Sequence, residues 1–213
     1  RVRPGEPIEL PLGVGAADLG VDVLSLRRGE HLLVAGQAHS GVSTSLRSLA
    51  RLVKLASPRS VLIGVADRDS PVRADVGVFD GLGTPDELEA VLALAAVDRE
   101  REWVVVVDDA HLLDAPPGLE DLLRAAHCRF VVGGRADHLQ GRVGHWTRSV
   151  RRCGSGVLLR PRLESDGDLL GVRLPRRLSV PMPAGRGFVV RGGVSKLVQM
   201  AGADLVASAA GAS

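Results

Sequence analysis

Short apolar runs divide the 213-residue chain at fairly regular intervals. Each run is almost continuously hydrophobic and most are rich in valine, which is typical of strands buried on both faces of a sheet rather than on one. The pattern predicts five strands, at residues 31–36, 60–67, 103–109, 129–134 and 156–161.

Segments with helical spacing lie between these runs. They are predicted at residues 44–56, 84–100 and 117–127. The second has the clearest start, with Thr84 as the N-cap, Pro85 in the first helical position and Glu87 completing a capping box. Because strands and helices alternate, we predict an α/β fold whose mostly parallel sheet is flanked by helices and has right-handed crossovers.

The alternation ends near residue 160, where short strands and turns are expected instead. The segment 185–201 predicts a C-terminal β-hairpin that turns at Gly192-Gly193. We expect one domain over residues 1–203 and a flexible tail of small residues at 204–213.

Composition narrows the classes of protein that need to be considered. Aromatic residues make up 2% of the chain, so the core must be aliphatic, and a net charge of +2 does not indicate a nucleic-acid binder. Two cysteines, Cys128 and Cys153, form neither a disulfide framework nor a metal cluster. The chain shows no signal peptide or membrane-spanning run and starts without Met. We therefore expect it to be a soluble domain excised from a larger protein.

The sequence GQAHSGVST follows the first predicted strand and leads into the first predicted helix. It resembles the phosphate-binding pattern G-x-x-x-x-G-K-[S/T], with Gly36, Gly41 and Ser43 in place but Val42 where the lysine belongs. Such a loop presents backbone N–H groups to an anion, and Ser43 is positioned to ligate Mg²⁺. The candidate nucleotide-binding residues are Gly36, Gln37, Ala38, His39, Ser40, Gly41, Val42, Ser43 and Thr44.

A second motif, WVVVVDDAHLL, ends the third predicted strand. A hydrophobic strand ending in Asp holds Mg²⁺ in phosphate-loop proteins, so Asp108 is a candidate metal ligand and Asp109 a candidate for acting on the attacking water. The alternative is that the two acids simply cap a strand end. Arg135, after the fourth strand, is either a sensor of the γ-phosphate or a solvent-exposed loop arginine.

Taken together, these motifs and the late segments GDLLGVRLPRR and AGRGFVVRGGVSKLVQMA resemble the FtsK/SpoIIIE-type ATPase domains. The similarity spans about residues 7–201 and is greatest to the actinobacterial EccC-type domains of type VII secretion. The resemblance implies a RecA-like P-loop NTPase fold, ATP with Mg²⁺ as ligand, and a multimeric motor. It also implies sister ATPase domains as partners, and either double-stranded DNA or a secreted protein with its signal peptide as the substrate.

Val42 departs from the family pattern, which has Lys or sometimes Arg there. Our leading hypothesis is a degenerate domain of a secretion motor, with impaired hydrolysis and a regulatory or substrate-docking role. The alternatives are an active ATPase whose substitute cation is Arg135 or an arginine from a neighbour, and an active DNA translocase. Between Arg142 and Arg177, nine arginines stand against three acidic residues and could follow DNA phosphates, but a solvated or subunit-facing arginine surface is the favoured interpretation. We expect a cytoplasmic domain, tied to a membrane only through other parts of its protein, in an actinobacterium-like host.

Overall fold

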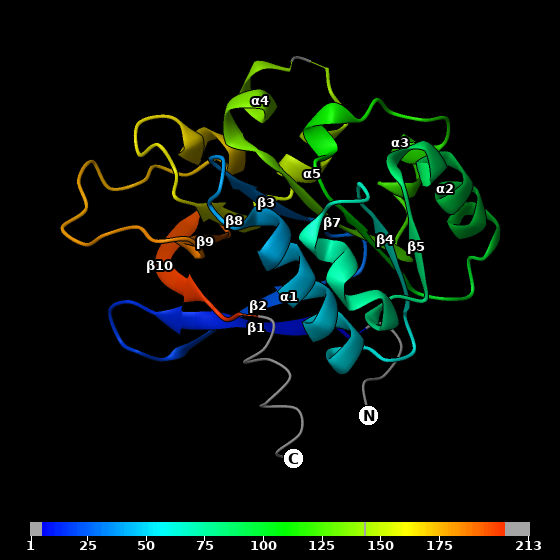
Figure 1. Cartoon of the computed structure of the whole chain (residues 1–213), viewed down its shortest axis with the longest axis horizontal. Coiled ribbons are helices and arrows are strands. Elements are labelled where there is room, and N and C mark those ends of the chain that lie inside the picture. The colour runs from blue at the N-terminus through cyan, green and yellow to red at the C-terminus, as the bar shows by residue number, and fades with distance from the viewer. Residues whose placement is uncertain (1–5, 143, 203–213) are drawn as a thin grey trace.

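A single ten-stranded sheet runs through the molecule in the order β2-β1-β10-β9-β8-β3-β7-β6-β4-β5. The computed structural model describes residues 6–142 and 144–202, so the predicted tail at 204–213 lies outside the described residues. Figure 1 shows β1 and β2 at one end of the molecule and α2 and α3 at the other.

The parallel half of the sheet contains the five predicted strands. They are observed as β3 (Leu32–Gly36), β4 (Val61–Val65), β6 (Trp103–Val107), β7 (Cys128–Arg135) and β8 (Gly156–Leu159). A short strand that was not predicted, β5 (Gly81–Gly83), pairs with β4 at the edge. All pairings from β8 to β5 are parallel, as the continuous apolar runs predict.

The other half is antiparallel. It consists of β9 (Arg186–Arg191), β10 (Val194–Met200), β1 (Ile8–Gly15) and β2 (Val21–Leu26). The predicted hairpin is β9–β10, and Gly192 and Gly193 both have positive φ at its turn. The β1–β2 hairpin was not predicted, although its buried residues alternate in the sequence.

The sheet is covered on both faces. One face packs against α1 (Val42–Ala56) and the 3₁₀ segment η1 (Pro71–Val78). The opposite face packs against α2 (Leu88–Val97), α3 (Leu119–Leu122), α4 (Ala136–Gly141) and α5 (Thr147–Arg151), together with the 3₁₀ segments η3 (Ala110–Leu112) and η4 (Asp166–Leu170). Successive strand residues serve the two cores in turn, as Leu32 and Leu33 of β3 do.

Two predicted helices are shorter than expected. The segment predicted at 84–100 begins as a 3₁₀ turn, η2 (Pro85–Glu87), in which Glu87 accepts the Thr84 backbone N–H, and its α-helix ends at Val97. Asp98 then caps a turn by accepting the Arg101 N–H. The segment predicted at 117–127 is helical only over α3, because i→i+3 bonds tighten the chain before it enters β7.

Among the described residues, no helix combines the length and the apolar character needed to cross a bilayer.

Candidate functional site

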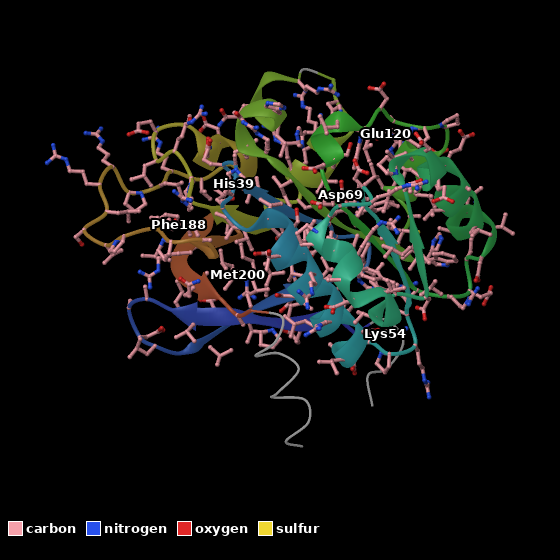
Figure 2. The ribbon with its side chains drawn as sticks, viewed as in Figure 1. His39, Lys54, Asp69, Glu120, Phe188 and Met200 are labelled. Carbon is pink, nitrogen blue, oxygen red and sulfur yellow. The ribbon has the colours of Figure 1, made fainter. Side chains whose placement is uncertain are left out.

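A cleft of about 470 Å³ opens at the carboxyl ends of β3, β6 and β7. All of the phosphate-loop candidates except Gly36 line it, and so do Asp109 and Arg135. Figure 2 shows His39, one of the residues that line the cleft, at the amino-terminal end of α1. Crevices at the carboxyl ends of parallel strands are the usual ligand sites of such sheets. The structure therefore brings the two sequence motifs together. The full lining is Gln37, Ala38, His39, Ser40, Gly41, Val42, Ser43, Thr44, Pro71, Asp109, Gly134, Arg135 and Ala184.

The backbone of the phosphate loop has the shape that anion binding requires. Gly36 is indispensable, because a Cβ there would collide with Ser40 Oγ and lie 2.8 Å from the Leu159 carbonyl oxygen. Gly41 has φ of 98° and His39 has φ of 58°, so the chain turns sharply into α1. The N–H groups of the first helical turn have no partner within the helix and are available to a ligand.

A short chain of hydrogen bonds ties this loop to the C-terminal hairpin. Gly185, just before β9, donates its N–H to the Ser40 carbonyl over 2.9 Å. Met200 of β10 donates its N–H to the Gly185 carbonyl over 2.8 Å. The loop is thus fixed to the antiparallel half of the sheet as well as to β3.

The side chain of Val42 occupies a structural position. It is partly buried and belongs to the same core as α1 and β3. Its Cγ1 lies directly over Gly133 of β7, only 3.0 Å from where a Cβ of that residue would be. The loop therefore has an apolar contact at the position where the phosphate-binding pattern has a cation.

Asp108 is buried at the end of β6, with 3% of its surface exposed. Its Oδ2 accepts the Ser70 hydroxyl over 2.6 Å, and that hydroxyl in turn accepts the Val72 N–H and caps η1. The other carboxylate oxygen, Oδ1, is buried without a hydrogen-bond partner among the described residues. An unsatisfied buried carboxylate oxygen is costly, and it suits a hard cation such as Mg²⁺.

Asp109 projects from a left-handed backbone conformation, with φ of 47°, and lines the cleft. Burial raises the pKa of this carboxyl, and the negative charges of Asp108 and Asp67 raise it further. Its Oδ1 lies 3.8 Å from Nδ1 of His111. Asp109 is therefore the carboxylate that a molecule in the cleft would meet, whereas Asp108 lies beneath.

Arg135 lies at the end of β7 with 43% of its side chain exposed, and its guanidinium is paired with Asp137. Nη2 donates to one carboxylate oxygen over 2.8 Å, and Nε donates to the other over 3.2 Å. The residue is thus both part of the cleft and held by a counter-ion.

Several site residues escaped sequence reasoning. Ser70 is the N-cap of η1 and Pro71 its first residue, Gly134 belongs to β7, and Ala184 lies in the loop before β9. Ser-Pro is a recognisable start for a helical turn, so Ser70 carried a usable signal. His111 is buried beside the cleft and accepts the Arg135 backbone N–H over 3.3 Å, and nothing in its sequence context indicates this.

No protein-family model matches the sequence, and no curated protein matches it. Solved structures do match. The cytoplasmic domain of the type VII secretion ATPase EccC from Thermomonospora curvata aligns at 17% identity with a TM-score of 0.70, over 92% of this chain and 26% of that one. ATPases 2 and 3 of the same EccC, in complex with a signal sequence peptide, align at 15% identity with a TM-score of 0.66, over 92% and 41%.

The conjugation coupling protein TcpA, in its monomer form with ATPγS, aligns at 15% identity with a TM-score of 0.60, over 99% of this chain and 75% of that one. The chain therefore has the fold of the P-loop ATPases, and the predicted RecA-like architecture is confirmed. It spans about a quarter to two fifths of the EccC chains it matches.

Proposed function

We propose that this chain is a degenerate ATPase domain of a protein-translocating motor similar to those of type VII secretion. In this proposal it binds ATP weakly, hydrolyses it slowly or not at all, and has a regulatory or substrate-docking role. One observation carries the proposal: in an otherwise intact phosphate loop, Val42 is packed over Gly133 where a phosphate-binding lysine would be needed.

The described residues fit a bound nucleotide in part. The first turn of α1 would bind phosphate oxygens, and Ser43 and Asp108 would hold Mg²⁺. When bound, Mg²⁺ would neutralise charge on the phosphates. Asp109 would orient the attacking water. Since the loop lacks its cation, the transition state would lose stabilisation on the order of 3 kcal/mol or more, which would make hydrolysis very slow.

Partners follow from the neighbours in structure. EccC contains several ATPase units, and one of its structures contains a signal sequence peptide. We extend this to the present chain: it would dock against sister ATPase domains and could take a secreted substrate's signal peptide. It would act in the cytoplasm, attached to a membrane only through other parts of its protein, in an actinobacterium-like host.

Calorimetric titration with Mg²⁺ and ATPγS tests the proposal, using the native chain, Val42→Lys and Val42→Met. The new ammonium should tighten binding at least about tenfold, because a charged hydrogen bond to phosphate contributes roughly 1.5–3 kcal/mol. Val42→Met is the matched control, since it is long and apolar but uncharged. Micromolar nucleotide binding together with steady ATP hydrolysis by the native chain would contradict the proposal that the domain is degenerate.

A second candidate is an active, ATP-dependent DNA translocase domain. Arg173, Arg176 and Arg177 are exposed on the loop between η4 and β9 and have no ion pair among the described residues. That loop projects from the body of the molecule in Figure 1. DNA affinity that falls steeply on a log–log plot against salt would support this candidate. No binding at low salt would remove it.

A further inference from the structure

Two arginines from different elements converge on one carboxylate beside the phosphate loop. Arg135, at the end of β7, makes a two-pronged contact with Asp137 in the first turn of α4. Arg162, in the loop after β8, brings its Nη2 to 4.0 Å from Oδ2 of the same Asp137. Of these three residues, Arg135 lines the cleft, and the other two lie next to it.

Arg162 also contacts the phosphate loop directly. Its Nη2 donates to Oε1 of Gln37 over 3.4 Å, and Gln37 is a cleft-lining residue. Gln37 Nε2 donates in turn to Asp166 over 2.9 Å, and the Arg162 backbone N–H donates to the same carboxylate over 2.8 Å.

Asp166 anchors this arrangement. It is fully buried, and the oxygen that does not bind Gln37, Oδ1, accepts hydrogen bonds from Gln140 Nε2 and the Ser165 hydroxyl. A carboxylate with that many donors holds its neighbours in fixed positions. The backbone of Arg162 is therefore held beside Gln37, and its side chain, which is 53% exposed, reaches from this fixed point to Gln37 and Asp137.

Asp137 is the acidic side chain that both guanidiniums approach. Hydrogen bonds from Arg135 are the main cause that lowers the pKa of Asp137 to about 2, so this carboxylate is ionised at neutral pH. Two guanidiniums therefore face the carboxylate of Asp137 at the edge of the loop, while the buried carboxylate of Asp166 and the cleft-lining carboxylate of Asp109 lie nearby. Guanidinium forks bind phosphate oxygens and carboxylate oxygens with the same geometry.

We propose that Arg135 and Arg162 together bind the terminal phosphate of a nucleoside triphosphate in place of the missing loop lysine, and that Asp137 competes with that phosphate for them. This inference rests on the proposed nucleotide binding. It assigns Arg162 a phosphate-binding role, and it implies that Asp137 lowers the affinity of the chain for the nucleotide. Asp137 should lower the affinity for triphosphates more than the affinity for diphosphates, because only a triphosphate has a terminal phosphate to place at the two arginines.

The test is calorimetric titration of the 213-residue chain with Mg²⁺ and ATPγS, and separately with ADP. Arg162→Gln should weaken ATPγS binding about tenfold and ADP binding much less. Asp137→Asn should tighten ATPγS binding about threefold to tenfold. Arg99→Gln and Asp121→Asn are matched controls, since they make the same charge changes at exposed positions that line a separate groove beside α2 and α3.

The outcomes separate this inference from the proposed function. If Arg162→Gln behaves like Arg99→Gln while the native chain still binds ATPγS, the arginine assignment is overturned and the proposed function stands. The same holds if Val42→Lys gains binding and Asp137→Asn does not. If no variant binds ATPγS, Val42→Lys included, both fall together. Opposite shifts in Arg162→Gln and Asp137→Asn that are specific to ATPγS would establish the site.

Discussion

The carboxyl ends of β3 and β6 lie at the same edge of the sheet, but they offer a ligand different kinds of groups. The loop after β3 offers backbone N–H groups, and its shape depends on Gly36 and Gly41. The end of β6 offers the carboxylates of Asp108 and Asp109. In the proposed function, the backbone after β3 would keep the shape of a phosphate-binding loop although Val42 carries no charge. The comparison separates what the backbone contributes to such a site from what charged side chains contribute.

The largest effect should come from disturbing the cradle itself. Gly36→Ala would force a Cβ against the Leu159 carbonyl and Ser40, so we expect about 3 kcal/mol of destabilisation and no detectable nucleotide binding. Chemical denaturation and calorimetry would measure both. Gly77→Ala is the control, because a Cβ there would meet nothing within 4 Å. Equal effects of the two substitutions would show that the tight loop is not needed.

The β6 end should respond strongly to acid. Burial first, then the charges of His138 and Arg135, lower the pKa of His111 to about 4 from its usual 6.5. The unfolded chain therefore takes up this proton first, so stability is full above pH 6.5 and falls as the pH drops toward 4. The loss should be on the order of 2–3 kcal/mol. Urea denaturation of the native chain and His111→Asn at several pH values would measure it.

In His111→Asn the amide oxygen can still accept the Arg135 N–H but cannot titrate. This variant should flatten most of the decline. A residual slope is expected from His31 and His145, whose pKa values burial also lowers. An unchanged pH profile in His111→Asn would exclude His111 as the main cause.

Neutralising each of two buried aspartates should change the free energy of unfolding in opposite directions. Asp108 has an oxygen without a partner, so Asp108→Asn should raise the free energy of unfolding without Mg²⁺ by about 1 kcal/mol and abolish any stabilisation by Mg²⁺ with nucleotide. Asp166 is fully hydrogen-bonded, so Asp166→Asn should lower it by about 2 kcal/mol. Denaturation with and without Mg²⁺ and ATPγS compares them. Matching signs would contradict a cation site at Asp108.

The smallest effect is expected at residue 42. Val42→Ala removes contacts with Gly133 and the α1 core, which should cost about 1 kcal/mol because the side chain is only partly buried. Nucleotide affinity should not change, since the valine gives nothing to the phosphates. A marked change in affinity without a loss of stability would show that Val42 serves the ligand rather than the core.

The sequence predicted the parallel half of the fold well and the antiparallel half less well. Continuous apolar runs such as Trp103–Val107 have few interpretations, whereas Pro11, Gly13 and Gly15 interrupt β1 and hide its alternation. The turn at Gly192-Gly193 was readable from the residues alone. The early end of α3 could not be predicted, because it results from i→i+3 hydrogen bonds that tighten the chain before it enters β7.

The site divides in the same way. The loop residues and Asp109 were predicted because a fixed spacing encodes a strand-to-helix turn and a strand end. The partners of Arg135 and Gln37 were not, since Asp166 is 129 positions away from Gln37 and meets it only in the folded chain.

The hydrogen bonds from Met200 to Gly185 and from Gly185 to Ser40 connect β10 directly to the phosphate loop. A displacement of β10 would therefore be transmitted to the phosphate loop through two hydrogen bonds, without involving the parallel strands. The reverse also holds, because a ligand that stiffens the loop would stiffen the C-terminal hairpin. In the proposed function, a partner bound to that hairpin would sense whether the cleft is occupied, with or without hydrolysis.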